Sequence, residues 1–144
     1  MIGNIAGKCY GRVFVGEKSI SIPDNVEVLF LPVDDNRTIC IFHIHSSSER
    51  YFCCSLVRYR AAIIYSHGNA ADCGSMLPRC MQMSERLDLD IVLYDYEGYG
   101  YSVGQPSGDS IRTDIEIVYH YLLKQFDSRK IFLYGESSMF NSDN

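Results

Sequence analysis

Three short, uninterrupted apolar runs constrain the fold of this chain more than any other feature of its sequence. The runs cover residues 61–65, 91–94 and 131–134. Apolar runs of this length are typical of strands that are buried on both faces. Apolar residues at helical spacing separate them, over residues 76–87 and 111–126. The order strand, helix, strand, helix, strand predicts parallel strands, right-handed crossovers and an α/β domain.

The charges and the proline of the two helical segments are compatible with helices. Pro78 fits the first helix because we expect it in the first turn, where a missing N–H costs little. In the second segment, Asp109, Asp114 and Glu116 lie near the start and Lys124 lies near the end. This distribution complements the helix dipole. Both segments are therefore predicted to flank the sheet as helices.

The amino-terminal part has a different pattern, which predicts two antiparallel strands. Polar and apolar residues alternate over residues 26–31 and 38–44, and the turn-forming sequence 34–36 lies between them. Residues 46–60 form a polar, irregular connection. We divide the chain into an amino-terminal extension with the antiparallel strands (1–60), an α/β core (61–138) and a polar tail (139–144).

Charge and hydropathy exclude several classes of function. The net charge of −5 gives no electrostatic support for binding nucleic acid, and no apolar run reaches the roughly 20 residues of a membrane-spanning helix. The six cysteines form no Cys-x-x-Cys pair, and we detect no secretory signal, so we expect reduced thiols and a cytoplasmic location. Cys9 lies near Lys8 and Arg12 and is a candidate for palmitoylation, which would add peripheral contact with the cytosolic face of membranes.

Glycine and polar residues follow each of the three predicted parallel strands. In open α/β sheets, function gathers beyond the carboxyl ends of the strands. After the third strand comes Gly135-Glu136-Ser137, and a serine at a strand-to-helix elbow is a candidate nucleophile. Met139 occupies the place where the full elbow has a second glycine. By itself, this short match also fits an ordinary loop that ends a core strand.

The loop after the first parallel strand gives the serine a chemical context. It reads Ser66-His67-Gly68-Asn69 and lies where an oxyanion-hole loop is expected. Gly68 lets the backbone turn, so that the backbone N–H of Asn69 can point at developing negative charge. We interpret His67 as a structural histidine, because the base of this class follows the nucleophile in sequence.

Taken together, these motifs resemble the α/β-hydrolase-domain 17 family over about residues 61–138. The matching stretches keep the family's order and spacing and cover residues 65–72, 94–100, 104–107 and 133–137. The resemblance implies an α/β-hydrolase-like, mostly parallel sheet with flanking helices. It also implies a serine hydrolase that removes palmitate from cytoplasmic protein cysteines through an acyl-enzyme, with an acylated protein or a small acyl ester as substrate and without a metal or cofactor. Ser137 would be the nucleophile, and the backbone N–H groups of Asn69 and Ser138 would form the oxyanion hole.

The sequence departs from the family at the elbow and after it. Glu136 replaces the family's glutamine, and Ser138-Met139 replaces its last two elbow residues. Only seven residues follow Ser137 and none is a histidine, whereas the Asp and His of a triad follow the serine in this fold. We therefore expect a fold truncated after the elbow strand, without activity on its own.

Two alternatives stay open at this point, and they concern what such a chain does. One is a non-catalytic fragment that binds acyl groups or a partner. In that case the strand 131–134 would be an apolar sheet edge suited to self-association. The other is a truncated gene model of an active hydrolase.

Two weaker signals point to other ligands. Gly98-x-Gly100 begins like a dinucleotide fingerprint, but Val103 occupies the third glycine's place. His43 and His45 share one side of a strand, as metal ligands do, but without a third ligand nearby we favour a solvent-facing pair. The sequence therefore predicts neither a nucleotide nor a metal site.

Overall fold

The structure, a computed structural model, describes residues 12–15, 18–46 and 60–136. These residues form seven strands and two α-helices with a short 3-10 turn before the last strand. The elements in chain order are β1 (Arg12–Val15), β2 (Lys18–Ser21), β3 (Val26–Pro32), β4 (Thr38–Ile44), β5 (Ala62–Ser66), α1 (Cys73–Leu87), β6 (Asp90–Tyr94), α2 (Gly108–Leu123), η1 (Ser128–Lys130) and β7 (Ile131–Gly135).

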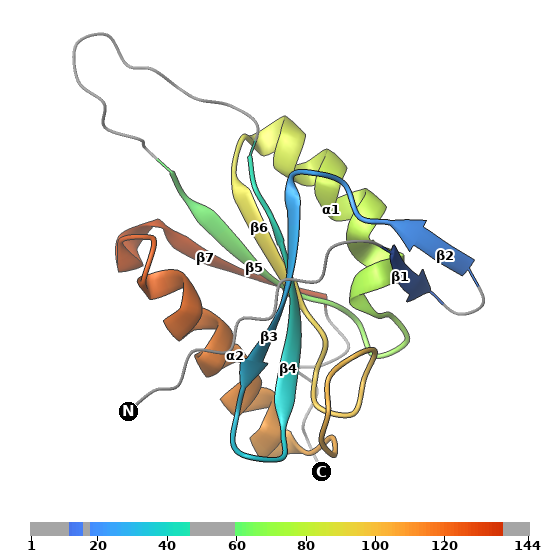
Figure 1. The fold of residues 1–144 in the computed structure, drawn as a ribbon. Coiled ribbons are helices and arrows are strands. Elements are labelled where there is room, and N and C mark those ends of the chain that lie inside the picture. The colour runs from blue at the N-terminus through green and yellow to red at the C-terminus, as the bar shows by residue number, and fades with distance from the viewer. Residues whose placement is uncertain (1–11, 16–17, 47–59, 137–144) are drawn as a thin grey trace, which may run out of the picture.

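Five strands form one sheet in the order β3-β4-β6-β5-β7 (Figure 1). β6, β5 and β7 run parallel to one another, and β4 is antiparallel to both of its neighbours. The three apolar runs are thus confirmed as parallel strands. The antiparallel pair predicted over residues 26–31 and 38–44 is confirmed as β3 and β4.

The two helices cover opposite faces of the sheet, which makes three layers (Figure 1). Leu77 and Cys80 of α1 pack with strand residues of one face, and Val118 and Leu122 of α2 pack with those of the other. β5 and β6 are apolar without alternation because both of their faces are buried. β1 and β2 form a separate antiparallel hairpin beside α1, which the sequence analysis did not predict.

Helix α1 starts earlier than the sequence predicted. Asp72 caps it, because its carboxylate accepts the backbone N–H of Ser75 at 2.7 Å and the Ser75 hydroxyl accepts that of Asp72. With the first residue at Cys73, Pro78 lies beyond the first turn, so our placement of this proline was wrong. Pro78 cannot donate to the carbonyl of Gly74, and the helix tolerates the loss of this one bond.

β7 is the edge of the sheet within the described residues, and its apolar side chains are exposed. Phe132, Leu133 and Tyr134 are exposed by 53%, 66% and 40%. The expected apolar sheet edge is therefore present in this part of the chain.

The prediction of a solvent-facing histidine pair is wrong for His43 of β4, whereas the side chain of His45, just after β4, is 35% exposed. His43 is completely buried, not solvent-facing, because its face of the sheet is covered by α2. A third metal-binding side chain is also nearby, since the register of β3 and β4 places Glu27 opposite His43. The sequence could not reveal this pairing, because the turn between the strands did not determine the register by itself.

Several predicted residues lie outside the described part of the chain. These are Cys9, the tail 139–144, and both Ser137 and Ser138. In the described part, Cys40, Cys73 and Cys80 are buried and form no disulfide. Neither described helix has the length and apolar character needed to cross a membrane.

Candidate active site

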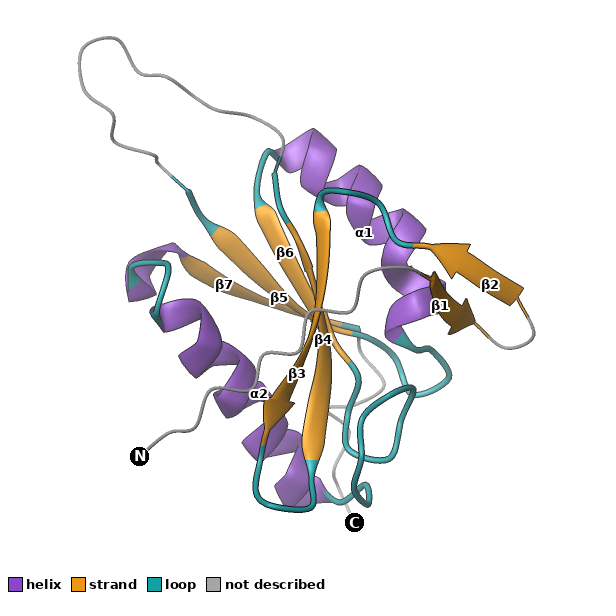
Figure 2. Cartoon of the chain, viewed as in Figure 1, coloured by secondary structure: helices purple, strands orange, loops and turns teal. Residues whose placement is uncertain are grey.

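Three loops converge at the carboxyl ends of β5, β6 and β7 (Figure 2 shows the loops that follow β5 and β6). The backbone N–H of Glu136 donates to the carbonyl of Ser66 at 3.0 Å, which joins the loops after β7 and β5. The hydroxyl of Tyr96 donates to the carbonyl of His67 at 2.9 Å, which joins the loops after β6 and β5. The described residues of the three motifs, up to Glu136 in the third, therefore lie together in space.

Asp95 organises this end of the sheet. Its carboxylate is buried and accepts the backbone N–H of Cys73, at the start of α1, at 2.8 Å and that of Tyr101 at 3.2 Å. Gly100 has a φ of +50°, and a Cβ atom at this position would overlap the Asp95 carboxylate. Glycine is required here both for the left-handed backbone and for the close approach. Asp95 therefore braces the loop after β6.

His67 faces Asp95 from the loop after β5. The imidazole is buried, its Nδ1 donates to the carbonyl of Gly68 at 2.9 Å, and its Nε2 lies 3.5 Å from Asp95 Oδ1. Burial opposes the charged imidazole, but Asp95 and the Gly68 carbonyl outweigh it and raise the pKa of His67. Burial likewise opposes ionisation of Asp95, but His67 and the N–H of Cys73 outweigh it and lower the pKa of this carboxyl. The arrangement fits the structural role that we predicted for His67.

Asn69 is exposed at the tip of the same loop. Its side-chain oxygen accepts the hydroxyl of Tyr99, which anchors the tip to the loop after β6. The role of its backbone N–H in an oxyanion hole stays a prediction. The nucleophile Ser137 and the second donor Ser138 also stay predictions, because they lie outside the described residues.

Glu136, the residue before the predicted nucleophile, is held by two side chains. Tyr65 donates its hydroxyl to Glu136 Oε1 at 2.6 Å, and Arg79 of α1 donates to the same oxygen at 2.8 Å. The Tyr65 hydrogen bond lowers the pKa of Glu136, so the carboxylate is charged at neutral pH. The sequence analysis missed Tyr65 and Arg79, because 71 and 57 positions separate them from Glu136 and no local pattern links them.

Two acidic residues, Glu97 and Asp114, lie under the loop after β6. Glu97 is buried, and its carboxylate accepts a hydrogen bond from Arg37 at 2.9 Å. Its backbone N–H donates to Asp114 of α2 at 3.0 Å. Burial raises the pKa of Asp114 to about 6, and its Oδ1 has no hydrogen-bond partner in the described part of the chain. This pair fixes the loop to α2 and to the hairpin of β3 and β4.

The sequence is similar to curated α/β-hydrolase proteins. It is 35% identical over 117 residues to alpha/beta hydrolase domain-containing protein 17C of Mus musculus, covering 79% of this chain and 33% of that protein. It is 38% identical over 98 residues to the 17C protein of Xenopus tropicalis, covering 62% of this chain and 32% of that protein. The chain thus spans about a third of the length of the curated relatives it matches. No family model matches it.

Solved structures agree on the fold. The thermostable carboxylesterase EstE1, cloned from a metagenomic library, matches with a TM-score of 0.60 at 15% identity, covering 82% of this chain and 39% of that one. The mostly parallel sheet with a helix on each face is therefore part of an α/β-hydrolase fold. Over most of its length the chain is therefore similar in sequence to α/β-hydrolase-domain 17 proteins, and its described residues form part of an α/β-hydrolase fold.

Proposed function

We propose that this chain carries the nucleophile of a serine hydrolase that cleaves acyl esters or thioesters, with palmitoylated proteins as substrates. The Ser137 hydroxyl oxygen would attack the acyl carbonyl carbon, the thiol or alcohol would leave, and water would then hydrolyse the acyl-enzyme. The backbone N–H groups of Asn69 and Ser138 would stabilise the oxyanion. We also propose that the chain acts in the cytoplasm, with Cys9 as a lipid anchor for peripheral membrane contact.

One observation supports this proposal more than any other. The bond from the Glu136 N–H to the Ser66 carbonyl links the strand that leads to Ser137 with the loop that carries Asn69. A nucleophile and an oxyanion donor must be close together for acyl transfer. The relatives, named α/β-hydrolase domain-containing proteins, support the same class of chemistry.

The proposal includes low turnover by the 144-residue chain alone. The four histidines all precede Ser137, and two of them, His43 and His67, are buried and already bonded. Without a base that takes the hydroxyl proton, the serine is a weak nucleophile. An added base of the right size should restore the first step in part.

The test is labelling with a fluorophosphonate, read by intact mass, with and without imidazole. Attack by the Ser137 oxygen on phosphorus expels fluoride, and imidazole takes the proton. We expect slow labelling of one site, at a rate that imidazole increases. Ser137→Ala should abolish the labelling. Ser138→Ala keeps its backbone N–H and should be labelled like the unchanged chain. A folded chain that is never labelled at Ser137 would contradict the hydrolase. Rapid labelling without imidazole would contradict only the claim that this chain lacks a base, and not the hydrolase itself.

A second candidate function is partner binding through β7, and the exposed Phe132, Leu133 and Tyr134 favour it. Apolar edge strands pair readily with other strands, including those of a second copy. Leu133→Lys should weaken self-association by about tenfold, or about 1.4 kcal/mol, in light scattering after gel filtration. Leu123→Lys, at a leucine of α2 exposed by 38%, is the matched control. Equal effects of the two changes would count against an interface at β7.

A further inference from the structure

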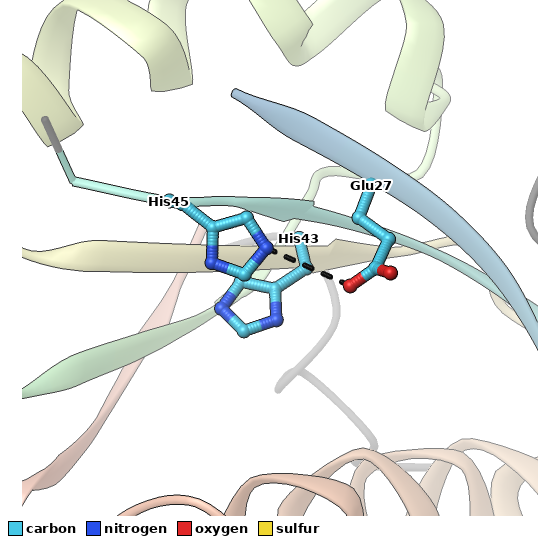
Figure 3. A group of neighbouring side chains, drawn as sticks. All are labelled: Glu27, His43 and His45. Carbon is cyan, nitrogen blue, oxygen red and sulfur yellow. Dashed lines mark ion pairs between the residues drawn. The ribbon is translucent and has the colours of Figure 1, made fainter. Parts of the chain in front are cut away.

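A second polar cluster lies at the opposite end of the sheet from the candidate active site. It consists of Glu27 of β3, His43 of β4, His45 just after β4, and Asp90, the first residue of β6. Figure 3 shows the rings of His45 and His43 one above the other, with the Glu27 carboxylate beside them. Their ring centroids are 4.1 Å apart. None of the motifs that resemble the hydrolase family includes these residues, and the proposed acyl transfer makes no use of them.

Glu27, His43 and His45 offer three ligand atoms that all lie within 4.8 Å of one another. In a zinc site the metal–ligand distances are about 2.0–2.2 Å, so tetrahedral ligand atoms lie about 3.3–3.5 Å apart. His45 Nε2 and Glu27 Oε2 are already 3.6 Å apart. Small rotations of these side chains would therefore close the set around one ion.

Asp90 lies behind both histidines and orients them. Its Oδ2 is 3.0 Å from Nε2 of His43 and 3.4 Å from Nδ1 of His45. A carboxylate that accepts the far N–H of an imidazole leaves a lone pair on the other nitrogen, which is the usual support of a metal-binding histidine. For His43 this leaves the lone pair on Nδ1. Nδ1 of His45 lies 3.4 Å from both Asp90 Oδ2 and Arg60 Nη2, and its Nε2 is the atom that faces Glu27. Nδ1 of His43 now lies 2.8 Å from the Tyr121 hydroxyl, which would turn toward the ion or away from it.

The charges of the cluster favour a divalent cation. The charged groups that face it are Glu27, Asp90 and Arg60, whose guanidinium bonds Asp90 and lies over the ring of Phe126. With both histidines neutral, these groups sum to one negative charge. The His45 side chain is 35% exposed, so an ion can reach the site from solvent.

We propose that Glu27, His43 and His45 form a zinc site with a fourth position open to water. Two imidazoles and one carboxylate are a typical ligand set for zinc with an exchangeable fourth ligand. Such an ion would tie β3 to β4 at the end of the sheet that the hydrolase chemistry does not use.

The experiment is a zinc titration of the chelator-treated 144-residue chain by calorimetry, together with zinc X-ray absorption of the loaded protein. We expect one ion per chain, a higher melting temperature with zinc, and a ligand shell of nitrogen and oxygen with two imidazoles. His45→Gln and Glu27→Gln should each weaken binding by about tenfold or more. His120→Gln, at an exposed histidine of α2, should leave zinc binding unchanged.

Three results would overturn the proposal: no zinc binding, equal affinity in both ligand variants and the wild type, or a sulfur shell in the absorption spectrum. His45 and Glu27 are only partly buried, so their variants are expected to fold, which circular dichroism checks. If either variant did not fold, the absorption spectrum of the wild-type chain would decide by itself.

Discussion

Two buried aspartates, one at each end of the sheet, are held in place in different ways. At the carboxyl end, Asp95 accepts backbone N–H groups from Cys73 and Tyr101. At the amino end, Asp90 is held mainly by side chains, those of His43, His45 and Arg60, and accepts one backbone N–H, that of Ser46, at 3.1 Å. A carboxylate held by the backbone requires particular loop conformations, whereas one held by side chains requires only that distant segments of the chain meet.

The largest effect is expected from Gly100→Ala, which disturbs the carboxyl end alone. The new methyl group would overlap Asp95 in a left-handed backbone, so the free energy of unfolding should fall by about 3 kcal/mol. Urea unfolding measures the change. Gly108→Ala is the control, because nothing lies within 4 Å of its added Cβ, and it should stabilise by about 0.5 kcal/mol at the start of α2. If both variants lost the same free energy of unfolding, the close approach to Asp95 would not be the cause of the loss in Gly100→Ala.

Arg60→Gln tests the amino end in the same way. The change removes the positive charge that is paired with the buried Asp90. Because the carboxylate is then left without this partner, the free energy of unfolding should fall by about 2 kcal/mol. Arg129→Gln breaks an exposed ion pair with Asp127 and should cost less than about 0.5 kcal/mol. If Arg60→Gln cost no more than Arg129→Gln, Asp90 would not depend on its side-chain neighbours.

The histidine at each end should respond to pH in opposite directions. The pKa of His43 is lowered, chiefly by burial, so on acidification below 6.5 the unfolded chain takes up the proton first and stability falls. The pKa of His67 is raised because Asp95 and Gly68 outweigh its burial, so its contribution is present below 6.5 and is lost as the pH rises through its folded pKa. Each slope is at most about 1.4 kcal/mol per pH unit.

Proton NMR of the imidazole Cε1–H signals, with a chelator present, measures both folded pKa values directly. His43 should titrate below 6.5 and His67 above it. The variants His43→Gln and His67→Gln assign the signals. Two histidines that titrate on the same side of 6.5 would mean that the two ends are electrostatically alike.

The smallest effect on stability is expected from Glu136→Gln at the carboxyl end. Glutamine can still accept from Tyr65, and Arg79 is 62% exposed, so the free energy of unfolding should change by less than about 0.5 kcal/mol. The change removes a negative charge beside the predicted oxyanion, so fluorophosphonate labelling at Ser137 should become several-fold faster, about 1 kcal/mol in barrier. Glu85→Gln, on the exposed face of α1, should leave the labelling rate unchanged.

The difference between the two ends explains what the sequence could predict. Asp95, Gly98 and Gly100 lie within six positions, inside the stretch 94–100 that carries the family resemblance, so this loop was visible in the sequence. The strands and helices of the core were predictable for a similar reason, since burial on one or both faces leaves a periodic pattern.

The amino-end cluster left no such pattern. Glu27, His43 and Asp90 come from three strands that meet only through the register of the sheet, and the burial of His43 depends on α2, which lies far away in the sequence. Pro78 was misplaced for a local reason. The capping box of Asp72 and Ser75 starts α1 before its first apolar residues at helical spacing, and the analysis relied on those residues.

The strand order also has a consequence for how the molecule assembles. β6 lies between β4 and β5, both of which precede it in the sequence, whereas β3 and β4 are joined by a short turn. The hairpin of β3 and β4 can therefore form as soon as it is synthesised, but it cannot join β5 until β6 arrives to fill the gap. β7 is then added to an edge that already exists. Folding during synthesis should thus wait for Tyr94, and not for the elbow, to make the sheet continuous.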